Sequence, residues 1–125
     1  MSRPVQITLI VLAVVIVAVV LFFVFAPSQA GNADKFNRTF TAAEQQLIDN
    51  TAITASELAA ADGKDGHPAW IAVDGVVYDL TASTQWPSGL HHGHLAGRDL
   101  TEPFLQSGHG VGVLQKLTVI GSAAP

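Results

Sequence analysis

The chain has 125 residues, with 10 acidic residues, 6 basic residues and no cysteine. This length leaves room for at most one ordinary domain. The absence of cysteine excludes a disulfide scaffold, a cysteine zinc site and covalent cofactor attachment through a Cys-x-x-Cys-His motif. No basic stripe is present to pair with phosphates, so the sequence predicts no nucleic-acid partner.

The N-terminal part of the chain is strongly apolar. Between Ile7 and Ala26 only Thr8 is not plainly apolar, and a run of about 20 such residues can cross a bilayer as one helix. It is longer than the ~7–15 apolar residues of a signal peptide. We therefore expect an uncleaved single-pass anchor over residues 5–26, although the small residues at 28–30 also resemble a cleavage site. The charge distribution around the run favours a domain on the extracytoplasmic side.

Residues 27–52 are predicted to form a polar linker that contains a possible short helix. The pattern Thr41-Ala-Ala-Glu44 is a capping box, in which the first and last side chains satisfy free backbone N–H groups at a helix start. The part of the chain after the anchor carries 5 basic and 10 acidic residues, a formal charge of −5. An acidic surface suits docking to a basic protein partner, and it also suits simple solubility.

The elements expected next along the chain indicate a small α+β domain. A second capping box begins at Thr54, and Asp74-Gly75 between two runs of β-forming residues predicts a tight hairpin. Thr101 is placed to cap a helix that contains Phe104 and Leu105. Thr118-Val-Ile120 is typical of a closing strand.

Four of the five histidines lie within residues 91–109. His91, His92 and His94 precede the helical segment, and His109 follows it between two glycines. Glycine beside a histidine allows a bulky group to approach the backbone. Two kinds of site fit this pattern. One is a metal ion held by several imidazoles, with Asp99 as a further ligand, and the other is a haem held between two imidazoles.

Residues 53–121 resemble the cytochrome b5-like haem/steroid-binding domain family. The resemblance is carried by four segments in order: the start I-T-A-S-E-L, the hairpin I-A-V-D-G-V-V-Y-D-L-T, the segment A-G-R-D-L-T with His109 thirteen residues after its alanine, and the closing L-T-V-I-G. It implies a domain over residues 53–122 in which a hairpin sheet and short helices form a haem pocket. His109 corresponds to the second axial histidine of the family.

The first axial ligand departs from the family pattern. Trp86-Pro87-Ser88-Gly89 stands where ordinary members carry His-Pro-Gly-Gly. The resemblance therefore leaves His91, His92 and His94 open as the first ligand, in that order of preference. His67 precedes the hairpin, so it is interpreted as structural or solvent-exposed.

The resemblance implies a membrane-anchored, non-enzymatic protein that binds haem b non-covalently through iron ligands His91 and His109. Its function would be one-electron transfer to a redox protein partner. Apolar pocket walls are expected from Leu100, Phe104, Leu105 and Leu114, and Tyr78 and Trp86 could pack at the pocket edge. Two alternatives remain open: a module that binds haem or a steroid-like hydrophobic ligand without redox chemistry, and a histidine cluster that binds metal.

Overall fold

The computed structural model describes residues 3–25 and 34–125. The chain divides into two compact units, residues 1–31 and 32–125, and each is described by itself. The first contains the helix α1 (Arg3–Phe25). Within it, Arg3–Leu21 is long and apolar enough to cross a membrane, a test that a signal sequence also passes. Residue 26 of the expected anchor lies outside the described residues.

The second unit is an α+β domain built on a five-stranded sheet of order β1-β7-β3-β2-β6. The β2–β3 and β3–β7 pairs are antiparallel, whereas β1–β7 and β2–β6 are parallel. The strands are β1 (Ala52–Ile53), β2 (Trp70–Val73), β3 (Val76–Asp79), β6 (Arg98–Asp99) and β7 (Thr118–Ala123). A separate two-stranded sheet joins β4 (Leu90–His91) to β5 (His94–Leu95).

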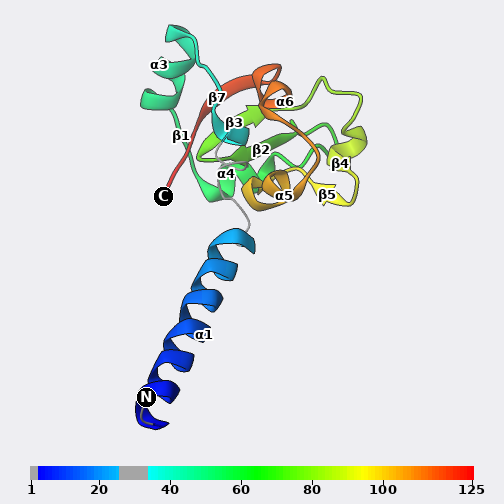
Figure 1. The fold of residues 1–125 in the computed structure, drawn as a ribbon. Coiled ribbons are helices and arrows are strands. Elements are labelled where there is room, and N and C mark those ends of the chain that lie inside the picture. Colours follow the sequence, from blue (N-terminus) through cyan, green and yellow to red (C-terminus); the bar gives the residue numbers. More distant parts are fainter. Residues whose placement is uncertain (1–2, 26–33) are drawn as a thin grey trace. The chain divides into compact units, whose positions relative to one another are not determined.

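Short helices complete the domain, and α5, α6, β4 and β5 gather on one side of it (Figure 1). The helical elements are η1 (Asp34–Phe36), α3 (Ala42–Asn50), α4 (Ala55–Ala60), η2 (Pro87–Gly89), α5 (Thr101–Gln106) and α6 (Val111–Gln115). Both expected capping boxes are present. Thr41 and Glu44 close the start of α3, and Thr54 and Glu57 close the start of α4.

The expected hairpin connects β2 to β3. Asp74 and Gly75 have φ angles of 49° and 76°, which are the left-handed conformations that a type I′ turn demands. The hairpin separates two apolar clusters because successive strand side chains point to opposite faces. Ile71, Val73 and Tyr78 belong to the cluster that contains α5 and α6 residues, whereas Ala72 and Val77 pack with Leu58 of α4.

Two details differ from expectation. Residues 27–52 were expected to form a linker, but from residue 34 onward they fold onto the domain: Phe36, Phe40 and Ile48 pack against its core, and residues 27–33 lie outside the described residues. Thr101 does not cap α5, because it is already the first helical residue. Its hydroxyl donates to Asp99 Oδ1 at 2.6 Å and accepts from the Asp74 N–H at 2.9 Å, so it ties the hairpin turn to α5.

Candidate haem site

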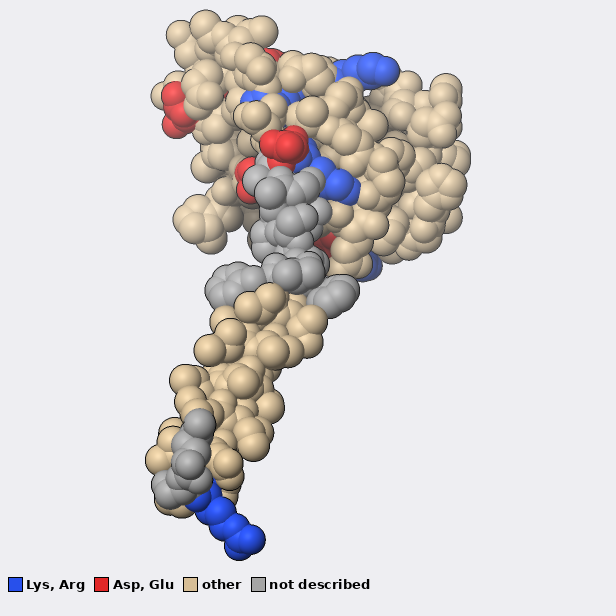
Figure 2. Space-filling view, viewed as in Figure 1, with Lys and Arg blue, Asp and Glu red and all other residues tan. Residues whose placement is uncertain are grey.

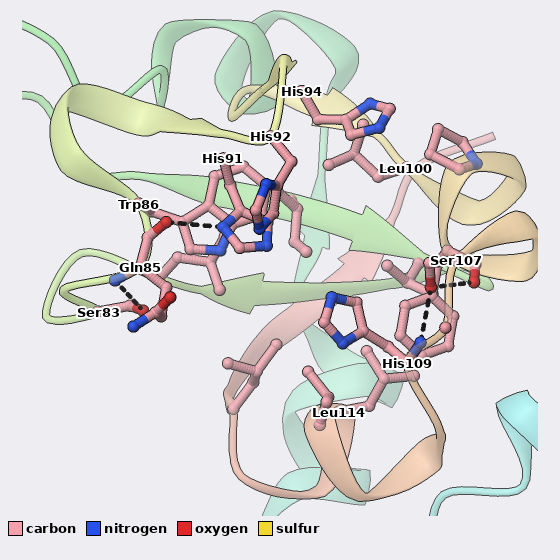
Figure 3. A pocket seen from close by; sticks show the side chains of 18 residues that line it. Ser83, Gln85, Trp86, His91, His92, His94, Leu100, Ser107, His109 and Leu114 are labelled. Carbon is pink, nitrogen blue, oxygen red and sulfur yellow. Dashed lines mark hydrogen bonds between the residues drawn. The ribbon is translucent and has the colours of Figure 1, made fainter.

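A cavity of about 490 Å³ opens on the side of the domain that carries β4, α5 and α6 (Figure 3). This volume lies within the range of ligand and cofactor sites. Its walls are mostly aliphatic and aromatic, and four histidines are among the polar residues that line it. The lining residues are Ile71, Val73, Leu80, Ser83, Gln85, Trp86, His91, His92, His94, Leu100, Pro103, Phe104, Ser107, Gly108, His109, Val113, Leu114 and Leu117.

His91 reaches the cavity from the end of β4. Its Nδ1 lies 2.8 Å from the Gln85 carbonyl oxygen. A carbonyl oxygen can only accept, so Nδ1 carries the proton and the neutral ring keeps its lone pair on Nε2. The Trp86 indole stacks on the same imidazole, with ring centres 5.0 Å apart and planes inclined by 28°. Both contacts fix the ring orientation of a side chain that could bind a metal ion through Nε2.

The turn before β4 depends on close backbone packing. Gly89 has a φ angle of 73°, and a Cβ atom there would lie 1.9 Å from the Asp62 carbonyl oxygen. Only glycine fits such a position, because it tolerates positive φ and has no Cβ. Ser88 also has a positive φ, of 51°. The segment Trp86-Pro87-Ser88-Gly89 therefore turns tightly against residue 62 and sets the direction in which β4 presents His91.

His109 reaches the cavity from the opposite side, in the loop between α5 and α6 (Figure 3). Its backbone N–H donates to Ser107 Oγ at 3.2 Å, and that hydroxyl donates to the Phe104 carbonyl at 2.7 Å. The His109 and His91 rings have centres 6.1 Å apart and planes inclined by 31°. The structure thus brings the two imidazole rings near each other in one cavity, although 17 residues separate the histidines in the sequence.

His92 and His94 also line the cavity, in different settings. His92 lies in the β4–β5 turn with a φ angle of 46°, and its ring meets the His91 ring edge-on with centres 4.3 Å apart. His94 stands on β5 directly opposite His91 in the strand register and is exposed. Neither ring has a hydrogen-bond partner among the residues that the structure describes.

Three of the four apolar residues expected to form the walls do so: Leu100, Phe104 and Leu114 are buried and line the cavity. The expectation was wrong for Leu105, which is half-buried and does not line it. Pro103, Phe104 and Ser107 form the side of this segment that faces the cavity, and Leu105, about 100° further round α5 than Phe104, lies outside that side. Trp86 lines the cavity as expected, whereas Tyr78 does not.

Two further sequence candidates lie elsewhere. His67 pairs its Nδ1 with Asp62 Oδ1 at 3.0 Å, outside the cavity, which agrees with its interpretation as a structural or exposed residue. Asp99, suggested as a metal ligand, instead accepts from the N–H and hydroxyl of Thr101. Within residues 3–25 and 34–125, no group of three or more histidine, cysteine or acidic side chains is arranged to hold a metal ion.

The lining of the cavity includes no Asp, Glu, Lys or Arg. Figure 2 shows the same pattern at the surface: the acidic and basic side chains visible in this view lie away from the side of the domain that carries β4. The acidic excess of the domain therefore does not come from the residues that line the cavity. A large cofactor in this site would lie among neutral side chains.

Two basic residues that contact α5 and α6 were not predicted from the sequence. Lys35 and Arg38, in the segment expected to be a linker, bind the C-terminal carbonyl groups of α5 and α6. Arg38 is buried and forms an ion pair with Glu44 at 2.8 Å. The hydrogen bond from Arg38, together with the one from the Thr41 backbone, lowers the pKa of Glu44 to about 2. The capping-box glutamate was visible in the sequence, but its distant cation partner was not.

Tyr78 is almost fully buried, with 1 % of its surface exposed. The burial raises the pKa of its phenol to about 12, because a phenolate would lose its solvation there. The Arg38 guanidinium lies 5.5 Å from the centre of its ring. Tyr78 is therefore a neutral core residue that supports Arg38, behind the wall of the cavity.

The comparisons with known proteins identify the family of the domain. A family model described as "Cytochrome b5-like Heme/Steroid binding domain" matches residues 54–124. The chain therefore belongs to the family of cytochrome b5-like haem/steroid-binding domains. No curated protein matches it.

Two solved structures are similar to the domain. A cytochrome b5 domain protein of Hadesarchaea YNP_N21 is 42% identical, with a TM-score of 0.56, over 58% of this chain and 97% of that one. A cytochrome b5 domain protein of Methanococcoides burtonii is 38% identical, with a TM-score of 0.57, over 60% of this chain and 99% of that one.

Proposed function

We propose that the domain binds one haem b non-covalently between His91 and His109 and carries single electrons. The observation that carries this proposal is the 6.1 Å separation of the two ring centres. Metal–imidazole bonds are about 2 Å long, so two imidazoles on opposite sides of one metal ion have ring centres about 6 Å apart. The two side chains thus have the spacing that axial ligation requires.

His91 is a better candidate for the first ligand than its two neighbours. Its Nδ1–H donates to the Gln85 carbonyl, which leaves Nε2 free and makes the ring a stronger base. Trp86 covers one face of the ring and limits its rotation. His92 and His94 have no such partner among the described residues. The tryptophan that replaces the family histidine would thus support a ligand that we place at residue 91.

When bound, a haem with imidazole on both axial positions supplies one-electron transfer and leaves no open position for oxygen or a substrate. The residues of this chain would bind and orient the group. Leu100, Phe104 and Leu114 would exclude water from its faces. Each ligating imidazole would have to be neutral, which makes binding sensitive to acid. We therefore propose an electron carrier and not an enzyme.

The setting of the domain is part of the proposal. The helix α1 has the length and composition of a membrane anchor, and we propose that it tethers the domain on the extracytoplasmic side. The redox partner would be another protein. Because the lining of the cavity contains no Asp, Glu, Lys or Arg, that partner would meet histidines and uncharged side chains around the cofactor and not an acidic patch.

A haem titration of the full chain in detergent tests the proposal. We expect one haem per chain, and reduced spectra with the sharp bands of low-spin iron. His91→Ala and His109→Ala should each give a five-coordinate, high-spin spectrum. His92→Ala, His94→Ala and His67→Ala are matched controls that should keep the low-spin spectrum. A low-spin spectrum in His91→Ala would contradict the assignment of the first ligand, and no haem binding at all would favour a module for another apolar ligand.

A further inference from the structure

The loop that carries His109 is held from outside the part of the chain that matches the family. Lys35, in η1, donates from Nζ to the carbonyl groups of Phe104, Leu105 and Ser107, at 3.3, 2.8 and 2.5 Å. Phe104 and Leu105 lie at the C-terminal end of α5, where the carbonyl groups carry partial negative charge, and Ser107 follows the helix. The Phe104 carbonyl also accepts from the N–H and the hydroxyl of Ser107. The ammonium group has three protons and so can serve all three acceptors.

Arg38 makes the equivalent contact with α6. Its Nε donates to the Leu114 carbonyl at 2.9 Å, and its Nη2 donates to the Leu117 carbonyl at 3.2 Å. Its side chain is only 2% exposed, and Glu44 balances its charge at 2.8 Å. A buried cation is tolerated only when it is paired and hydrogen-bonded, as here. Arg38 therefore fixes the segment from which Lys35 extends.

The loop needs such a restraint because of its composition. His109 stands between Gly108 and Gly110, and a Cβ atom at either glycine would meet nothing within 4 Å. Glycines in open surroundings give a free chain many conformations, which must be given up when the imidazole is placed. The contact from Lys35 to the Ser107 carbonyl lies two residues before His109, on the residue whose hydroxyl accepts the His109 N–H.

We propose that Lys35 is a positioning residue for His109. Arg38 holds in place the segment that carries Lys35. Both lie before residue 54, where the family match begins. The functional domain would thus include the segment that joins it to α1. This inference rests on the proposed function, since it assumes that His109 binds haem iron.

The test compares full-length variants in detergent, each loaded with haem. Lys35→Met removes the donors and keeps the length of the side chain. Lys35→Arg restores donors, and Lys116→Met removes an exposed lysine that follows α6. We measure the rate of haem transfer to excess apomyoglobin and the low-spin fraction by electron paramagnetic resonance. Since hydrogen bonds from charged groups are among the stronger ones, Lys35→Met should release haem about tenfold faster.

The expected pattern is faster release and a larger high-spin fraction in Lys35→Met, recovery in Lys35→Arg, and wild-type behaviour in Lys116→Met. Identical release and spectra in Lys35→Met and Lys116→Met would overturn the inference, even if Lys35→Met melted at a lower temperature. If Lys35→Met does not fold, Lys35→Gln is compared with Lys116→Gln by the same criteria. A wild-type protein that binds no haem would refute the proposed function as well, whereas unchanged Lys35 variants of a haem-binding wild type refute this inference alone.

Discussion

The indole of Trp86 stacks on the imidazole of His91, with ring centres 5.0 Å apart. Trp86 stands at the position where ordinary members of the family carry the first axial histidine. The presence of tryptophan in place of histidine at residue 86 therefore keeps an aromatic side chain at the site. It places a large ring behind a different histidine, and the Gln85 carbonyl on the neighbouring residue holds the Nδ1 of that histidine.

This relationship predicts that Trp86 matters for haem affinity. Aromatic pairs contribute about 0.5–1.5 kcal/mol beyond the area that they bury. Trp86→Leu should therefore weaken haem binding roughly threefold to tenfold, while Trp86→Phe should stay close to wild type. Competition for haem with apomyoglobin measures both affinities. Equal loss in the two variants would show that the stacking geometry does not matter.

The ion pair between Arg38 and Glu44 predicts a dependence of stability on pH. The pKa of Glu44 is about 2 in the folded protein, against an ordinary value of 4.5. The unfolded state therefore binds a proton first as the pH falls, so the stabilisation is complete above about 4.5 and is lost as the pH approaches 2. Glu44→Gln should be less stable than wild type at pH 7, and the difference should shrink on acidification.

Urea unfolding of the full chain in detergent between pH 7 and pH 2.5 measures this difference. Asp65→Asn is the control, because Asp65 is exposed and its side chain has no hydrogen bond to the described residues. A difference between wild type and Glu44→Gln that stays constant over the whole range would contradict the assignment to this carboxylate.

Two glycines with similar backbone angles should respond differently to alanine. Gly66 has a φ of 83° with nothing near its missing Cβ, whereas Gly89 has a φ of 73° and the Asp62 carbonyl at 1.9 Å. Gly66→Ala should cost only the strain of a left-handed alanine, about 1–2 kcal/mol. Gly89→Ala should cost clearly more and should also weaken haem binding, because the turn that directs β4 must move. Thermal unfolding and haem titration of both variants check this expectation.

Leu58 and Leu114 belong to different apolar clusters of the domain. Changes at these two residues can therefore distinguish effects on folding stability from effects on haem binding. Leu58 and Leu114 are 8% and 2% exposed, but only Leu114 lines the cavity. Large-to-small changes in a core cost about 2–5 kcal/mol, so both Leu58→Ala and Leu114→Ala should destabilise the haem-free protein. Only Leu114→Ala should alter the spectrum of bound haem. An altered spectrum in Leu58→Ala at a temperature where it is fully folded would argue against this separation.

The sequence by itself determined the features whose physical causes lie within a few residues. Both capping boxes and the Asp74-Gly75 turn were predicted, because their hydrogen bonds and backbone angles depend on near neighbours. The family resemblance added two further predictions, the α+β domain and the general position of the pocket. Leu105 and Thr101 show the limit of such local reasoning, since a shift of one residue along a helix changes which way a side chain points.

Only the tertiary structure decided how the histidines meet and what holds them. The sequence could rank His91, His92 and His94, but the stacking with Trp86 and the spacing to His109 come from the folding of β4 against the α5–α6 loop. The importance of Lys35 was also hidden, because its acceptors lie 69 to 72 residues further along the chain. A lysine in a polar segment has no local signal of its partner. Its role arises only when folding brings the carbonyl groups at the end of α5 within reach of its ammonium group.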